Sequence, residues 1–327
     1  MSVFFRRRAA LALAALLALS APAHHAFGQG ARAETAADDA ALKQRADALF
    51  QSVGEGGGTV RWSALEAGEG PESLVIRQIE IVSKDKKKVT IEELAIKRYD
   101  WTNPREPRHA EMAMKKLVIA ADQLDAEAAA NFRELGLTEL TLNGELTFRF
   151  DETEKAFDVA KLFIDFAELG EVRLRFKLTG ITAADLKTAI PPDKPRNGKQ
   201  ANRKTDAQEG QAVMSLLARL NLAGAALGFR DKSLVERMVR ADARKKNLSE
   251  AAAKAKILED LAAERAKAED DVTKEFIDAA IKFLGKPGEI ELALAPPAPA
   301  NVMAAFMMVM GNRATFKQMM GLTVSVK

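Results

Sequence analysis

Six methionines crowd into a short stretch near the carboxyl end of the 327-residue chain, together with two phenylalanines. Thioether sulfur is soft and polarisable, so such a cluster suits either Cu(I) or an irregular apolar partner. The chain has no cysteine, and no histidine lies near the stretch, so no other soft ligand assists a metal there. The residues that we predict to form a binding site are Met303, Phe306, Met307, Met310, Met319 and Met320.

This methionine-rich stretch has three interpretations. Its helical spacing favours packing into a hydrophobic core, where long unbranched side chains fill gaps. A second interpretation is a pliable apolar surface for a lipid or a protein partner, and the predicted binding residues belong to that one. The third is Cu(I) coordination. Replacing the methionines with leucine separates a special surface from ordinary packing.

Catalytic motifs are hard to find elsewhere. Ser83 and Lys86 match the S-x-x-K spacing of penicillin-recognising enzymes, but the companion S-D-N and K-T-G motifs are missing from the sequence. The lysine-rich run at 84–88 instead predicts a solvated hairpin turn. Gly54–Gly58 lacks the G-K-[ST] ending of a phosphate-binding loop and predicts a helix end. His109, the one histidine beyond residue 33, has no second imidazole to share a metal with and predicts a solvated side chain.

We therefore predict that the protein is not an enzyme and uses no cofactor and no metal. Catalysis would need a carboxylate pair or a Ser–Lys dyad assembled from distant segments, and converging carboxylates with raised pKa values would mark such a site.

The elements that would hold these residues follow from hydrophobic periodicity. The sequence predicts a first helix over 36–52, strands over 60–67, 74–83, 89–99 and 111–121, and a short helix over 125–135. An antiparallel meander follows over 137–150, 157–166 and 171–178, where apolar and polar residues alternate. Doublets such as Glu92-Glu93 and Lys115-Lys116 interrupt the alternation and predict bulges or edge positions.

The second half of the chain mixes both periods. A strand is predicted over 216–229, then two or three amphipathic helices over 233–284 with Ser249 as an N-cap. Strands over 290–294 and 322–326 flank the methionine-rich helix. The fold class is therefore α+β: a curved antiparallel β-sheet of about 8–10 strands with amphipathic helices packed on one face.

The amino terminus predicts export. Arg6, Arg7 and Arg8 precede an Ala/Leu-rich run of about 13 residues, which suits a signal peptide and is shorter than the ~20 residues that span a bilayer. Small-residue cleavage sites end at Ala23, Ala26 and Ala33, and the last is favoured because an acidic start follows. We predict a periplasmic protein with no transmembrane segment after cleavage.

Four segments organise the chain. Residues 1–33 form the signal peptide, 34–190 the amino-terminal helix with the meander, 191–211 a polar linker or loop, and 212–327 the helical region with the last strands. We expect the last segment to pack on the same sheet as the second.

Removing the signal peptide changes the charge. The chain carries 49 basic and 46 acidic residues, and residues 1–33 hold four of the basic ones and no acid, which leaves 45 against 46. A nearly neutral domain does not predict nucleic-acid binding. Without cysteine there is also no disulfide framework.

The segments "LGLTELTLNGELTFRFDE", "FLGKPGEIELALAPPAP" and "MGLTVSVK" resemble a family of uncharacterised exported proteins from alphaproteobacteria, over most of residues 130–327. More remotely, the alternating strands are similar to periplasmic β-rich proteins of the AsmA-like type. That resemblance implies a long curved sheet, lipid handling and envelope assembly, and neither group brings a catalytic motif.

The expected function is a non-enzymatic periplasmic binding or envelope-maintenance protein that holds a lipid or other apolar ligand between sheet and helices. The alternative is a structural or protein-interaction module of the cell envelope, whose partner is an envelope protein.

Overall fold

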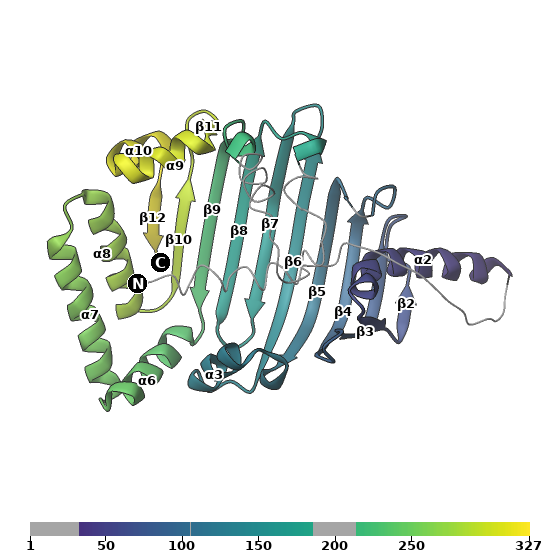
Figure 1. The fold of residues 1–327 in the computed structure, drawn as a ribbon, viewed down its shortest axis with the longest axis horizontal. Helices are drawn as coiled ribbons and strands as arrows, with labels where there is room; N and C mark the ends of the chain where they lie inside the picture. Colours follow the sequence, from purple (N-terminus) through teal and green to yellow (C-terminus); the bar gives the residue numbers. More distant parts are fainter. Residues whose placement is uncertain (1–32, 105, 186–213) are drawn as a thin grey trace, which may run out of the picture. The chain divides into compact units, whose positions relative to one another are not determined.

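The computed structural model describes residues 33–104, 106–185 and 214–327 (Figure 1). Its strands are β1 (Thr59–Arg61), β2 (Ala64–Glu66), β3 (Leu74–Val82), β4 (Lys88–Tyr99), β5 (His109–Ala120), β6 (Glu139–Asp151), β7 (Ala156–Phe166), β8 (Gly170–Thr179), β9 (Asn221–Asp231), β10 (Glu289–Leu294), β11 (Ala300–Asn301) and β12 (Thr323–Val326). Its longer helices are α2 (Ala33–Glu55), α3 (Ala126–Glu134), α6 (Leu234–Lys246), α7 (Glu250–Lys267), α8 (Asp271–Gly285), α9 (Val302–Gly311) and α10 (Arg313–Met320).

Twelve strands of the described residues form one open antiparallel sheet, in the order β1-β3-β4-β5-β6-β7-β8-β9-β10-β12, with β2 beside β3 and β11 beside β9. The predicted α+β class is confirmed. The sheet has more strands than the predicted 8–10, because the predicted strand 60–67 is split into β1 and β2 and the two-residue β11 was not predicted. Such short pieces leave no period-2 pattern in a sequence.

Two of the sequence predictions fall on parts of the chain outside the described residues. The signal peptide covers residues 1–33, of which 1–32 are not described, and the predicted linker at 191–211 is not described either. The strands on either side of that linker, β8 and β9, pair with each other from Gly170↔Asp231 to Thr179↔Asn221.

The chain divides into two compact units. One comprises the chain up to Ala129 together with Glu139–Glu145, and the other comprises Ala130–Thr138 and Leu146–Lys327. The first unit therefore holds α2 and β1–β5, and the second holds β7–β12 with the helices from α6 onward.

In the first unit the apolar face of the sheet is buried. Register places apolar residues side by side in rows across β3, β4 and β5, for example Ile76↔Leu94↔Met114. Ile76 is 0% exposed, and Leu49 and Phe50 of α2 are buried as well. Helix α2 packs against β1, β2 and β3, and Phe50 stacks on Trp62 with ring centroids 5.9 Å apart. Helix α2 thus covers this face over β1, β2 and β3.

Left-handed residues, rather than bulges, occur where the alternation breaks in these strands. Gln78 in β3 and Lys116 in β5 both have positive φ, 52° and 49°, and both lie opposite Glu92 of β4 in the register. The pairing on either side of Gln78 and Lys116 keeps one register, so neither residue is an insertion. Ile76 and Ile79 lie on the same buried face although three positions separate them. The bulge predicted at Lys115-Lys116 is wrong, because the register of β4 and β5 is unbroken there and shifts instead between Ile96 and Arg98 of β4.

In the second unit two separate clusters cover the apolar face of the sheet. Val235, Val239 and Ala243 of α6 pack with Ala253 of α7 and Phe283 of α8, and with partly buried Phe229 and Ile290 of the sheet. The other cluster groups Phe150, Ile181 and Leu220 with Phe157, Leu178 and Val302 around it. Between these clusters the sheet is less covered: Leu227, paired with Leu174 and Leu292, keeps 47% of its surface exposed.

Two predicted elements need correction. The predicted strand 216–229 begins only at Asn221, because residues 214–217 are helical and Leu220 N donates to Leu216 O at 3.1 Å. Leu216 and Leu217 then pack on the second cluster as helix residues. The predicted strand 60–67 is split into β1 and β2, which pair with different parts of β3.

Candidate functional site

The methionine-rich stretch forms two consecutive helices, α9 and α10, joined at Asn312. Asn301 caps α9 by accepting a hydrogen bond from Ala304 N at 3.0 Å, and Asn312 caps α10 by accepting one from Thr315 N at 3.0 Å. Gly321 ends α10 with a left-handed backbone (φ 56°), and its Cα lies against Ala295 O, where a Cβ would clash at 2.3 Å. These signals place the two short helices between β11 and β12 (Figure 1).

The predicted binding residues are mostly exposed. Their exposed fractions are 61% for Phe306, 62% for Met307, 76% for Met310 and 41% for Met319, whereas Met303 is partly buried and Met320 is only 1% exposed. Core packing, which the helical spacing favoured, is therefore wrong for four of these six side chains and right for Met320. The physical reason is the position of α9. The helix follows β11 directly, and the residue of α9 that packs on a core cluster is its first one, Val302.

Helix α9 presents an apolar surface with no polar side chain. None of its ten residues is buried, and no charged residue occurs between Glu291 and Arg313. Val309, 36% exposed, adds to the predicted residues. The exposed residues Phe306, Met307, Val309, Met310 and Met319 together make up the α9–α10 apolar surface. Large exposed apolar side chains grouped in this way are typical of interaction sites.

Ion pairs hold the polar side of α10 against α8. Arg313 Nη1 donates to Asp270 Oδ2 at 3.0 Å and to Thr273 Oγ1 at 2.7 Å, and Lys317 pairs with Glu275. The hydroxyl of Thr273, its backbone N–H and the Arg313 guanidinium lower the pKa of Asp270. Both cations of α10 are therefore engaged with α8, and Met319 remains outward.

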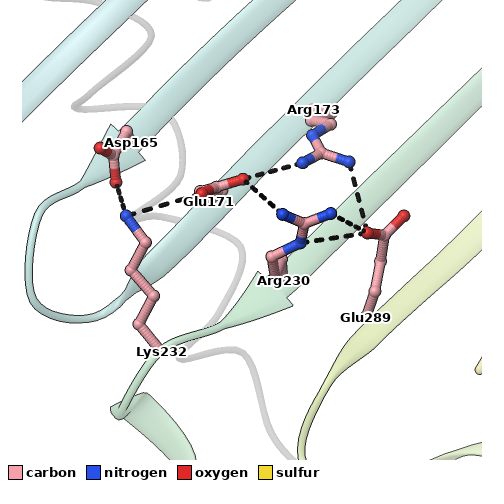
Figure 2. Close-up of polar contacts among 6 residues, drawn as sticks. All are labelled: Asp165, Glu171, Arg173, Arg230, Lys232 and Glu289. Carbon is pink, nitrogen blue, oxygen red and sulfur yellow. Dashed lines mark hydrogen bonds and ion pairs between the residues drawn. The ribbon is translucent and has the colours of Figure 1, made fainter. Parts of the chain in front are cut away.

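A second polar cluster, missed by the sequence analysis, lies on the face of the sheet opposite to Phe229 and Ile290 (Figure 2). Glu289 Oε2 accepts from Arg230 Nη2 at 2.9 Å and from Arg173 Nη1 at 3.3 Å. Glu171 accepts from Arg173 Nη2 at 2.8 Å. Lys232 Nζ lies 2.6 Å from Asp165 and 3.6 Å from Glu171, so it separates two carboxylates that face each other across β7 and β8.

Two members of this cluster, Glu289 and Lys232, are held in their ionised forms. Hydrogen bonding by Arg230 lowers the pKa of Glu289, and hydrogen bonding to Asp165 raises the pKa of Lys232. A general acid or base needs a pKa near the working pH, which requires shifts in the opposite directions. The cluster is thus suited to joining strands rather than to moving protons. Its residues alternate with the apolar row, so the only sequence signal was the period-2 pattern itself.

The remaining sequence candidates are structural. Ser83 lies in the hairpin turn as predicted, where its Oγ accepts from Lys87 N at 3.1 Å and Lys86 has φ 61°. His109 Nε2 lies 3.4 Å from a carboxylate oxygen of Glu72, at the start of β5. Gly56 and Gly58 follow the end of α2 and bond back to its last turn.

Within 33–104, 106–185 and 214–327, no three His, Cys, Asp or Glu side chains are grouped so that they could hold a metal ion. In the same ranges, no helix combines the length and the apolar character needed to cross a membrane.

A family model described as "Uncharacterized protein" matches residues 163–327, which is just over half of the chain. No curated protein matches the chain. The matched range contains the whole charge cluster of Figure 2 and both helices of the α9–α10 apolar surface.

Proposed function

We propose that this chain, which belongs to the family of uncharacterized proteins just described, is a non-enzymatic, exported protein that binds lipid through the α9–α10 apolar surface. The observation that carries the proposal is the combination of exposure and composition in α9: no buried residue, no charge and no polar side chain. The apolar ligand then lies on the helices, at an end of the sheet, rather than between sheet and helices.

Hydrocarbon suits this surface better than a protein does. A protein interface carries about one hydrogen bond per 100–200 Å² and is surrounded by polar side chains. Between Asn301 and Asn312 no side chain offers a donor or an acceptor. Lipid acyl chains need neither, and burying a phenylalanine or methionine side chain in them contributes about 1.5–3 kcal/mol.

The depth of contact follows from the length of the helix. Ten residues of α-helix measure about 15 Å, which is half of a bilayer's hydrocarbon core. Helix α9 is therefore too short to cross the core, and in this proposal it lies on the membrane surface with its exposed side chains among the acyl chains. A periplasmic location, proposed from the Arg6–Ala21 region, would place such a helix beside an envelope membrane.

Vesicle flotation tests the proposal. Met310→Asp places a charge on the most exposed residue of the surface and should lower the fraction of protein that floats by about tenfold or more, since an ionised group resists leaving water. Met238→Asp is the matched control: Met238 is 49% exposed on α6, so a similar substitution there should leave flotation unchanged.

The outcomes separate lipid binding from the alternative. Failure of the unaltered protein to float with vesicles, while Met310→Asp abolishes a specific crosslink to an envelope protein, would favour the interaction module instead. Equal loss of flotation in both aspartate variants would show that the α9–α10 apolar surface has no special role.

A further inference from the structure

Methionine, rather than leucine, supplies most of the exposed α9–α10 apolar surface. Met307, Met310 and Met319 keep 62%, 76% and 41% of their surface in solvent, whereas Met320 beside them is 1% exposed and Met114 in the first unit is 7% exposed. Leucine would supply a similar apolar area without a reactive atom. The α9–α10 apolar surface thus presents three accessible methionine side chains, whereas Met320 and Met114 are shielded.

An accessible thioether is a two-electron reductant. When hydrogen peroxide meets it, the sulfur attacks one peroxide oxygen, an S–O bond forms and the O–O bond breaks. The sulfur is oxidised by two electrons, the departing hydroxide takes the remaining proton, and the products are methionine sulfoxide and water. Enzymes specific for each sulfoxide epimer reduce it back to the thioether with two electrons from a pair of thiols, which become a disulfide while the oxygen leaves as water.

We propose that Met307, Met310 and Met319 form a reversible oxidation site that switches lipid binding off; this inference rests on the proposed function. A sulfoxide is polar and needs a hydrogen-bond donor when it leaves water. Helix α9 has no donor side chain to offer, and the two cations of α10 are held by Asp270 and Glu275. An oxidised surface would therefore carry unsatisfied oxygens into hydrocarbon, so the oxidised protein stays in water.

The bound state should also protect the same sulfurs. Side chains inserted among acyl chains meet dissolved peroxide less often than side chains in water, so vesicles should slow oxidation at Met307 and Met310. Met214 and Met238, which are 54% and 49% exposed elsewhere in the chain, should react at the same rate with and without vesicles.

The test combines peroxide titration with flotation on vesicles of phosphatidylethanolamine and phosphatidylglycerol. Peptide mass spectrometry should find sulfoxide at Met307, Met310 and Met319 before Met320 or Met114. Oxidation of the full-length protein should lower the floating fraction by about tenfold, and treatment with both classes of methionine sulfoxide reductase should restore it.

Two variants make the result specific. A triple variant with Met307→Leu, Met310→Leu and Met319→Leu should float as the unaltered protein does and should keep floating after peroxide. Combined Met214→Leu and Met238→Leu, which leaves the site intact, should remain sensitive. Loss of flotation in the triple leucine variant after peroxide, or full flotation of the oxidised unaltered protein, would overturn the switch while leaving lipid binding in place. Failure of the reduced protein to float would overturn both.

Discussion

At the scale of single residues, cross-strand register explains the charge cluster of Figure 2. Asp165, Glu171, Arg230 and Glu289 lie directly opposite one another across β7, β8, β9 and β10. Charges that oppose each other in a sheet contribute to its pairing when their signs differ and weaken it when they agree. Lys232 and Arg173 supply the missing opposite charges, so each carboxylate has a cation.

The pH dependence of stability follows from Glu289. Its pKa is lowered from 4.5 in the folded chain, chiefly by the hydrogen bond from Arg230. A lowered pKa stabilises the fold above the unfolded value, and that contribution disappears as pH falls through the folded value. Glu289→Gln should therefore lower the free energy of unfolding by about 1 kcal/mol at pH 7 and flatten its fall below pH 4.5. Urea unfolding at pH 7 and pH 3 measures both.

Glu259→Gln is the control for this experiment. Glu259 pairs with Lys256 on α7 at 3.3 Å, but its side chain is 72% exposed, so its loss should change stability little at either pH. An unchanged pH profile for Glu289→Gln would show that the cluster does not couple folding to protonation.

At the scale of elements, one asparagine joins three pieces of the second unit. Asn301 caps α9 through its Oδ1, and its Nδ2 donates to Ala218 O at 2.8 Å and Leu220 O at 3.3 Å. The same residue ends β11, which pairs with the first residues of β9. The direction in which α9 leaves the sheet therefore depends on Asn301, and so does the exposure of the α9–α10 apolar surface.

Substitutions at the two caps should differ. Asn301→Ala removes one accepted and two donated hydrogen bonds and should cost about 2 kcal/mol, whereas Asn312→Ala removes a single cap and should cost about 1 kcal/mol. Asn301→Asp keeps the cap and loses the donated bonds, so its cost in stability should fall between those of Asn301→Ala and Asn312→Ala. Thermal unfolding measures the order, and equal costs for Asn301→Ala and Asn301→Asp would show that the cap contributes nothing.

At the scale of the molecule, the two units bury their sheets to different extents. In the first unit α2 covers β1, β2 and β3, and residues such as Ile76 of β3 are fully buried. In the second unit the helical clusters leave Leu227 47% exposed in an interior strand. The edge strand β12 is nevertheless covered, because α8 packs along it and Lys282 Nζ donates to Val326 O at 2.8 Å.

Matched truncations test this difference. Ile76→Ala should lower the free energy of unfolding by about 2–5 kcal/mol, since it leaves a cavity in a closed core. Leu227→Ala should cost about 1 kcal/mol or less, because the side chain already meets water. Denaturant titration of both variants measures the two losses of stability. Equal losses would mean that Leu227 is covered in solution.

Much of the local structure could be predicted from the sequence, since its signals are local. The 2-residue period predicted β6, β7 and β8, and Ser249, which accepts a hydrogen bond from Ala252 N at 3.2 Å, was predicted as a cap. Single-residue signals such as the left-handed Gln78 escaped prediction, because a non-glycine residue carries no mark of positive φ.

Composition by itself determined that Phe306, Met307 and Met310 form an uncharged apolar stretch with helical spacing. Only the tertiary structure decided that they face solvent while Met320 enters the core. The same pattern suits a buried helix and an exposed one, because burial depends on what packs against the helix. Likewise the charge cluster joins residues from Asp165 to Glu289, which strand register brings together across more than a hundred positions of chain.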